Sequence, residues 1–555
     1  MFFRKKVNKG HTYIQLVENR REGGRTRQRQ LASLGRLDEL QASGSLDELL
    51  KSGGKFAQSA AVIAGARNGE LDQVRSQRIG AAVVFERLWQ ETGCQRVIQD
   101  LLKERAFSAP IERAVFATVL HRLVAPGSDR ACEHWLRDEG VAGSEELQLQ
   151  HLYRAMAWLG ETLETDDEGA RTTRSTKDVI EERLFDRRRN LFDDLELVLV
   201  DTTSLFFYGE GGAELGVRGH SKDRRPELKQ LILAIVVDQR GRPICSQTWP
   251  GNTADVKALL PIVARLRERF CIDRVCVVAD RGMVSSATIA ELARRNIGYI
   301  LGTRERRDKE VREAVLDDSR GFIPLSLPRI GHESTDIEIK DVRVEDRRYV
   351  VCRNPEQAEH DAEAREAMVA GLRDKLRQGD KALVGNSGYR RFLRTVGDDH
   401  FEIDDDRIAA EAKFDGISVL RTNTDLPAAE VARQYRQLWL VEQIFRTAKA
   451  ILRTRPIYHQ SDAAIRGHVF CSFLALVLRK ELEERLAAAG VTAEWPEILR
   501  DLEAIHETEV RDGEQHFVLR DHAQGCAGEV CRAVGVALPP LFRNLSEAGR
   551  GAASA

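Results

Sequence analysis

Three acidic residues, Asp201, Asp280 and Glu442, stand where transfer of a phosphodiester would need carboxylates. In-line transfer at phosphorus is served by two hard cations roughly 3.5–4 Å apart, at the attacking and the leaving oxygen. Such cations prefer carboxylate ligands, which here would converge from different elements. Asp201 follows the apolar run 195–200 and Asp280 follows the run 274–279, so we predict that both close strands. We therefore expect all three residues to be catalytic and to hold two divalent cations.

The third carboxylate lies within a segment that we predict to be one long helix, about 427–452. Tyr435 and Lys449 stand seven residues either side of Glu442, so helical spacing places the three side chains on one face. Arg446 lies one turn beyond Glu442 on the same face. This face offers one metal ligand together with cations for phosphate groups.

Two segments near these carboxylates are rich in basic residues. Glu442 is the only acidic residue within 433–459, and the loop 218–226 is also basic. Contact with the phosphates of nucleic acid is the natural use of such segments. The candidate DNA-binding residues are Lys449, Arg446, Tyr435, Arg436, Lys222, Arg224, Arg225, Arg453, Arg455 and His459.

The elements that must position the two aspartates follow the order β-β-β-α-β-α-β. The predicted strands are 195–200, 231–237, 243–249, 274–279 and 297–301, and the predicted helices are 256–269 and 286–296. Three antiparallel strands followed by crossover helices predict a mixed sheet with helices on its faces. Open α/β sheets place their ligands at strand ends, which is where both aspartates are expected.

The whole chain has the composition of a folded protein, with 42% hydrophobic and 31% charged residues among 555. Its longest apolar run, 468–478, is shorter than the roughly 20 residues of a membrane span, and no signal peptide is evident. The nine cysteines show no spacing typical of structural zinc or disulfides. A net charge of −2 does not by itself indicate nucleic-acid binding, so that prediction rests on the basic segments.

At these residues the chain resembles the DDE transposases of bacterial insertion sequences. A Gly-x-Ser-Lys-Asp-x-Arg-Pro stretch at 219–226 and a Gly-Asn-x-x-Asp stretch at 251–255 match that family, as does the apolar strand before the first aspartate. The spacing of Tyr435, Glu442 and Lys449 matches the glutamate helix of one large subgroup. That subgroup has arginine where this chain has Leu438, so its DNA contact is either lost here or taken over by a neighbour such as Arg436 or Arg446.

The resemblance implies a ribonuclease-H-like core and cut-and-paste transposition. It implies two Mg²⁺ ions as cofactors, with Mn²⁺ expected to substitute, held by Asp201, Asp280 and Glu442. The expected partners are double-stranded DNA, both terminal inverted repeats and target DNA, and a second copy of the chain in a homodimer. We expect no membrane association and a place in the bacterial cytoplasm at the nucleoid.

The predicted fold class is α/β. It consists of a ribonuclease-H-like mixed sheet with flanking helices, a β-rich insertion in that core, an N-terminal β-hairpin and a helical DNA-binding region. We expect a small, basic, β-containing region at 1–78 and a helical, DNA-binding region at 79–190. The catalytic core is expected at 191–305 and 414–480, with the insertion at 306–413 between its two parts. The last region, 481–555, is expected to be helical with a frayed tail.

Other interpretations stay open on the sequence alone. A metal-dependent nuclease of the same fold would hydrolyse DNA without strand transfer, and a catalytically silent DNA-binding protein could descend from a transposase. An aspartate that closes a strand is usually a turn residue, and only the coincidence of three acidic positions favours catalysis. We interpret Trp439 as a core residue, and His459 as a neighbour of phosphate rather than a metal ligand because no second histidine stands at ligand spacing.

Overall fold

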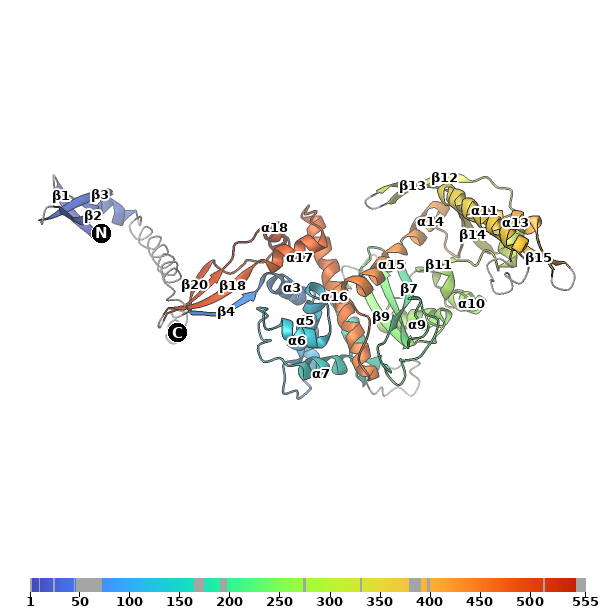
Figure 1. The fold of residues 1–555 in the computed structure, drawn as a ribbon, viewed down its shortest axis with the longest axis horizontal. Coiled ribbons are helices and arrows are strands. Elements are labelled where there is room, and N and C mark those ends of the chain that lie inside the picture. Colours follow the sequence, from blue (N-terminus) through green and yellow to red (C-terminus); the bar gives the residue numbers. More distant parts are fainter. Residues whose placement is uncertain are drawn as a thin grey trace. The chain divides into compact units, whose positions relative to one another are not determined.

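The computed structural model forms two compact units (Figure 1). One contains Met1–Gly80, Asp501–Gln524 and Leu538–Ala555, and the other contains Ala81–Arg500 and Gly525–Ala537. The structure describes residues 2–8, 10–22, 25–43, 45, 72–163, 174–189, 197–272, 276–329, 332–378, 391–396, 400–512 and 515–545. The predicted frayed tail at 546–555 and the starts of the strands predicted at 195 and 274 lie outside the described residues.

The first unit begins with an antiparallel sheet in which β2 is the middle strand. Its strands are β1 (Phe2–Asn8), β2 (His11–Glu22) and β3 (Arg25–Arg36), and the helix α1 (Leu37–Ala42) follows. The predicted hairpin is therefore a sheet of three strands. The sequence did not indicate β3 because its first half, 25–30, alternates arginine with threonine and glutamine and carries no apolar residue.

A second sheet in this unit pairs a strand from the N-terminal part of the chain with three strands from its C-terminal part, in the order β20-β19-β18-β4. Its strands are β4 (Asp72–Arg78), β18 (His506–Asp512), β19 (Gln515–Arg520) and β20 (Phe542–Asn544). The region 481–555 is therefore not wholly helical, although α17 (Trp495–Glu503) and α18 (Ala527–Val534) lie within it. Val510 and Phe517 pack together in this sheet, but β18 holds a single strongly apolar residue, too weak a pattern to predict a strand.

The second unit opens with the helices expected within 79–190. They are α3 (Gly80–Glu91), α4 (Cys94–Leu102), α5 (Ile111–Val124), α6 (Asp129–Trp135), α7 (Leu149–Leu159) and α8 (Thr176–Arg187), with the short strands β5 (Thr162–Leu163) and β6 (Arg174–Ser175). The apolar helix α16 (Asp462–Ala488) packs against α5 and α7. A Cβ on Gly160 or Gly467 would lie 1.9 Å from a backbone oxygen of the facing helix, so only glycine permits this approach of α7 and α16.

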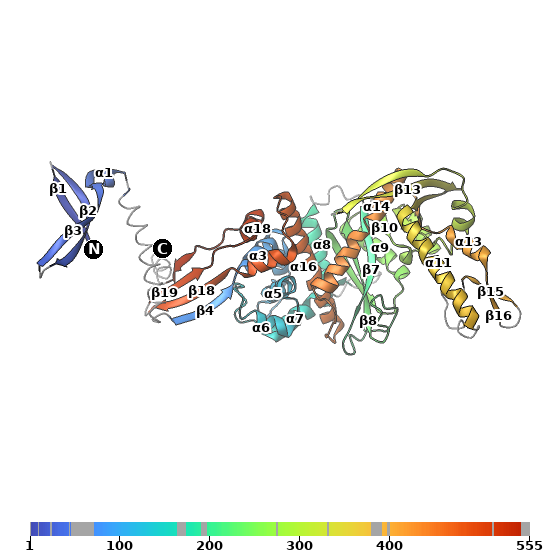
Figure 2. The ribbon, with the colours of Figure 1, turned by 45° about the horizontal axis from the view of Figure 1, so that its top comes forward.

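A mixed sheet of nine strands occupies the rest of this unit in the order β12-β13-β14-β17-β11-β10-β7-β8-β9 (Figure 2). The predicted succession is confirmed by β7 (Leu197–Phe206), β8 (Gln230–Asp238), β9 (Pro243–Pro250), α9 (Leu259–Phe270), β10 (Cys276–Ala279), α10 (Ser286–Arg294) and β11 (Gly298–Gly302). Strands β7, β8 and β9 are antiparallel, whereas β10 is parallel to both β7 and β11. The chain is thus a mixed α/β protein.

Strands from the segment 306–413 extend this same sheet. They are β12 (Ile323–Arg329), β13 (His332–Val344) and β14 (Arg347–Arg353), which join the core strands through β17 (Ile417–Thr422). The remaining elements of the segment are η4 (Val311–Val315), α11 (Pro355–Gln378), β15 (Leu393–Val396), β16 (His400–Ile403) and α13 (Asp405–Ala412). Leu372 and Phe392 lie in a small apolar cluster of their own.

The two faces of the sheet carry different helices. Val198 and Val200 of β7 and Val277 and Ala279 of β10 pack in one apolar cluster with α9 and α10. Because side chains alternate along a strand, the residues between and after these point to the opposite face. The helix α15 (Trp439–Arg446) packs against β7 and β8. None of the helices in the described ranges is long and apolar enough to cross a membrane.

A buried ionic cluster joins α8 to α9 beneath the sheet. Arg265 lies 2.6 Å from a carboxylate oxygen of Glu181 and 3.0 Å from one of Asp178, and Lys177 lies 2.8 Å from Asp178. The side chains of Arg265 and Glu181 are almost fully buried. Charges in such a place are stable only when each has its partner.

Replacement of Arg265 by leucine should lower the free energy of unfolding by about 3–5 kcal/mol, because Glu181 and Asp178 would stay buried with too little positive charge. Urea unfolding followed by circular dichroism measures this loss. Glu268→Ala on the exposed side of α9 is the control and should change stability by less than about 0.5 kcal/mol. Equal midpoints for Arg265→Leu and the control would contradict the importance of the cluster.

Candidate active site

Asp201 and Asp280 lie side by side at the end of a parallel ladder. The pairing of β10 with β7 ends at Ala279 opposite Val200, so the next residues of neighbouring strands are the two aspartates. The prediction that the strand closes at Asp201 is wrong. Strand β7 continues to Phe206, because Thr202–Phe206 are buried and pair with β8. Alternation along both strands turns the aspartates away from α9 and toward the face that α15 covers.

Glu442 lies on a helix that is interrupted, not on one continuous helix over 427–452. The segment consists of α14 (Ala428–Arg436), α15 and the π-helical turn η6 (Thr447–Ile451). Between α14 and α15 the backbone makes tighter bonds, as from the N–H of Leu438 to the carbonyl of Tyr435 at 3.1 Å. Tyr435 and Lys449 therefore lie on different pieces of helix from Glu442.

All three predicted catalytic carboxylates line a single cavity of about 390 Å³. The side chains of Tyr435, Arg436 and Trp439 line it as well. Trp439 is 37% exposed, so the prediction that it belongs to the core is wrong. Its place at the start of α15 turns it into the cavity rather than into the sheet, a difference that helical periodicity across 427–452 did not reveal because the helix is broken before it.

The site concentrates negative charge. The pKa of Asp201 is raised to about 6, first by burial and further by the charges of Asp280 and Asp255, while Lys222 and the N–H of Thr202 act in the opposite direction. A buried carboxylate beside two others is complementary to a divalent cation. The donors at Asp201, Asp280 and Glu442 are all carboxylate oxygens, so they fit a hard cation such as Mg²⁺ or Mn²⁺.

Tyr435 orients the second aspartate. Its hydroxyl donates a hydrogen bond to Oδ1 of Asp280 over 3.1 Å. Burial, with the nearby charge of Asp280, raises the pKa of Tyr435 far above its usual value, so the hydroxyl stays protonated and remains a donor. A Cβ at Gly302, the last residue of β11, would lie 2.4 Å from this hydroxyl oxygen, so a glycine is needed there.

Lys222 from the loop 219–226 supports the strand that carries the first aspartate. Its ammonium group donates to the carbonyl and hydroxyl oxygens of Thr202 at 2.7 and 2.8 Å and lies 3.1 Å from Asp255. The hydroxyl of Thr202 in turn donates to Asp255 over 2.7 Å. Asp255 was not predicted as a site residue, although its Gly-Asn-x-x-Asp motif, directly after β9, was a signal that could have pointed to it.

Asp223, the next residue of the loop, binds two of the predicted DNA-binding cations. Lys449 donates to its Oδ1 over 2.9 Å, and Nε of Arg455 lies 3.4 Å from its Oδ2. Asp223 and Lys449 are nearly buried, and burial lowers the pKa of Lys449. The loop 219–226, which lies between β7 and β8, is thereby tied to the segment that follows the glutamate helix.

The remaining predicted cations lie at the surface or the cavity wall. Arg224, Arg446 and Arg453 are exposed. Arg225 is exposed with its guanidinium carbon 5.9 Å from the centre of the Phe206 ring. Arg436 lines the cavity and donates to the hydroxyl of Thr335 over 2.9 Å.

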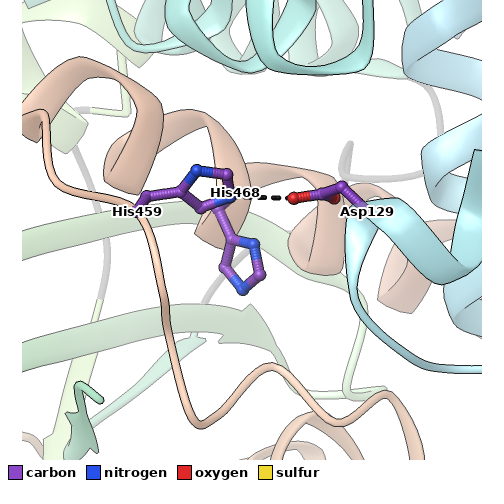
Figure 3. Close-up of side chains that lie close together, drawn as sticks. All are labelled: Asp129, His459 and His468. Carbon is purple, nitrogen blue, oxygen red and sulfur yellow. Dashed lines mark ion pairs between the residues drawn. The ribbon is translucent and has the colours of Figure 1, made fainter. Parts of the chain in front are cut away.

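His459 points inward, and its Nε2 lies 3.1 Å from a carboxylate oxygen of Asp129 (Figure 3). A second histidine, His468, does come close: ligand atoms of the three residues lie within 4.8 Å of one another. Nδ1 of His468 lies 2.9 Å from a guanidinium nitrogen of Arg122, and its Nε2 lies 3.0 Å from the carbonyl oxygen of Thr454. The positive charge of Arg122 beside Nδ1 of His468 would repel a cation bound at this cluster. The contact of His459 with Asp129 instead links the loop after η6 to α6.

Comparison with known proteins identifies the family. Residues 193–478 match the family described as transposase DDE domain. The chain belongs to the DDE transposases. Residues 3–64 also match the IS1634 family transposase N-terminal domain, which places this transposase with those of insertion sequences. DDE transposases transfer phosphoryl groups of DNA and use divalent metal ions.

Solved structures of other transposases resemble the chain distantly. A piggyBac transposase synaptic complex with hairpin DNA is 10% identical and has a TM-score of 0.34, with 76% of each chain covered. A Mos1 transposase paired-end complex with the left transposon end is 15% identical over 37% of this chain and 66% of that chain, with a TM-score of 0.15. No curated protein matches this transposase.

In the transposase, Tyr435→Phe should raise the metal concentration needed for half-maximal DNA cleavage by about 10–100-fold, because Asp280 loses the donor that orients it. Titration of Mg²⁺ or Mn²⁺ in a cleavage assay measures the change. Tyr349→Phe is the matched control, since it removes a buried tyrosine bond to Glu310 away from the cavity. A metal requirement unchanged by Tyr435→Phe would show that the hydroxyl does not position Asp280.

Asp223→Asn should reduce both stability and cleavage, because Lys449 and Arg455 lose the charge that holds η6 against the loop. Loss of one partner from a buried pair costs about 3–5 kcal/mol, and we expect cleavage to fall by about tenfold or more. The measurements are thermal unfolding and cleavage below the unfolding range. Asp415→Asn, which breaks a similarly buried pair with Arg365, should lower stability and spare cleavage. The same rate in both variants would count against a positioning role for Asp223.

Proposed function

We propose that this transposase cuts DNA at the ends of its element and joins the freed ends to target DNA in a cut-and-paste reaction. The observation that carries the proposal is the convergence of Asp201, Asp280 and Glu442 on one cavity from two strands and a helix. The strand order β9-β8-β7-β10-β11, with two antiparallel pairings followed by two parallel ones, agrees with a ribonuclease-H-like core. That core would comprise 191–305 and 414–480.

In this proposal, Asp201, Asp280 and Glu442 hold two Mg²⁺ ions, for which Mn²⁺ substitutes. When bound, the two ions would activate the attacking oxygen and stabilise the leaving oxygen of an in-line displacement. Tyr435 fixes the rotamer of Asp280 through its hydrogen bond. Lys222, braced by Asp255, sets the backbone at Thr202 and with it the carboxylate of Asp201.

Two displacements at phosphorus follow in sequence. In the first, on the strand that will be joined, water loses a proton and its oxygen attacks the phosphodiester at the element end, and the bond from phosphorus to the 3′ oxygen breaks. The departing 3′ oxygen takes up a proton and becomes a hydroxyl. In the second, this 3′ hydroxyl loses its proton and attacks a phosphodiester of target DNA, where a 3′ oxygen leaves in turn. The number of phosphodiester bonds is conserved in the second step, so no energy source is needed.

The DNA is proposed to run over the exposed cations of the loop 219–226 and of the glutamate segment, Arg224, Arg225, Arg446 and Arg453. Phosphate contacts of this kind position DNA without reading its sequence. We assign recognition of the terminal inverted repeats to the basic region 1–78 and the helices within 79–190. The enzyme would act as a homodimer on the two ends, in the bacterial cytoplasm at the nucleoid.

The full-length protein should cut labelled DNA that carries the element's own ends and join it to target DNA in Mg²⁺ or Mn²⁺, and EDTA should stop both steps. Glu442→Gln should lower both rates by about 100-fold or more, because the third carboxylate is lost. Glu430→Gln is the matched control, since this carboxylate lies on α14 beside Arg433 and outside the cavity.

Each of the other possible results of this assay would indicate a different function for the chain. Metal-dependent cleavage that never proceeds to joining would identify a nuclease of the same fold. Binding without cleavage in any metal would identify a silent DNA-binding protein. Full activity of Glu442→Gln would remove this residue from the metal site.

A further inference from the structure

A second cavity, of about 410 Å³, adjoins the active site and shares Asp280 with it. Besides Asp280, its charged lining consists of Arg281, Arg304, Glu305, Arg306 and Arg307. The candidate DNA-binding residues predicted from the sequence include none of these arginines. The cavity therefore adds a concentration of positive charge directly beside the proposed metal site.

The topology of the sheet brings these arginines together. Arg281 follows β10, and the turn 304–307 follows β11, which is parallel to β10, so both segments leave the sheet at the same edge. The turn is closed by a bond from the N–H of Arg307 to the carbonyl of Arg304 at 2.8 Å. It is anchored at Thr303, whose N–H donates to the carbonyl of Val419 over 2.9 Å.

Two of the four arginines are held in place by acidic residues. Glu305 is 6% exposed, and its Oε1 lies 3.1 Å from Arg281 and 3.5 Å from Arg306. Arg306 is also paired with Glu411 at 3.1 Å. The buried Glu305 thus lies at the floor of the cavity and holds the guanidinium groups of Arg281 and Arg306 in position.

Arg304 and Arg307 are exposed on the cavity wall. Within the part of the chain that the structure describes, neither guanidinium group has an acidic partner within 4.0 Å. Of the two carboxylates in the lining, Glu305 is engaged with Arg281 and Arg306, and Asp280 is assigned to the metal site. The cavity is left with donors for an anion.

We propose that this cavity is a phosphate subsite for the DNA strand that is cut, and that it binds a backbone phosphodiester neighbouring the one in the active site. The proposal rests on the proposed function. Arg304 and Arg307 donate to the phosphate oxygens, for which the planar guanidinium fork is suited. Arg281, which directly follows Asp280 in the chain, lines the same cavity. Binding there would hold the strand at a set distance from Asp201, Asp280 and Glu442.

The test measures DNA binding by the full-length protein in EDTA, with a fluorescent duplex carrying the element's end and its flank, at a series of salt concentrations. Arg304→Ala/Arg307→Ala should weaken binding by about tenfold. The slope of log affinity against log salt should become less steep by about 1, the signature of one lost phosphate contact. Arg312→Ala is the matched control, an exposed arginine nearby that does not line the cavity, and it should change neither quantity.

A lysine pair, Arg304→Lys/Arg307→Lys, should restore the salt slope but only part of the affinity, because it keeps the charge and loses the fork. Wild-type affinity and slope in the alanine pair would overturn the proposal, and so would an equal loss in Arg312→Ala, which would mean a general effect of surface charge. A wild-type protein that binds no DNA would overturn the proposed function itself. If the wild type binds DNA and the alanine pair binds it equally well, the phosphate subsite is wrong but the proposed function stands.

Discussion

The parallel pairing of β7 with β10 sets the position of the candidate active site, because it ends with Val200 opposite Ala279. One residue further, aspartates follow on two neighbouring segments, whose backbones in a sheet are about 4.8 Å apart, and both side chains point to the face away from α9. Like charges at that separation repel, and burial increases the cost of ionising them, which is reflected in the raised pKa of Asp201. In the proposed function, divalent cations would offset this repulsion, so the strand pairing that brings the two carboxylates together also suits them to hold metal.

The glutamate reaches this centre through side-chain bonds rather than through one straight helix. Tyr435 fastens α14 to Asp280 on one side of Glu442, and Lys449 fastens η6 to Asp223 on the other side. The helix can therefore break before α15 and still present Glu442 to the cavity. The loop 219–226 has a structural part in this arrangement, since Lys222 supports the aspartate strand while Asp223 holds the turn after the glutamate helix.

Basic residues in this protein fall into two groups that the sequence does not separate. Lys222, Lys449 and Arg455 have buried or half-buried acidic partners, whereas Arg224, Arg446 and Arg453 are exposed. Both groups are equally basic in the sequence, and only the position of an acidic partner far along the chain distinguishes them. The same reasoning applies to Arg304, Arg306 and Arg307: they share a cavity with Asp280 only because β11 lies beside β10, a pairing that no local pattern in the sequence encodes.

Local sequence patterns were enough to predict the order of strands and helices from 195 to 303 and the three acidic positions that line the cavity. Apolar periodicity and the residues that follow a strand are local properties, so they can be read from neighbouring positions. Three features had to be read from the folded chain: β7 continues past Asp201, Trp439 faces the cavity, and Asp223 binds Lys449, 226 positions away. Those outcomes depend on contacts between distant segments, and no local pattern encodes which segments meet.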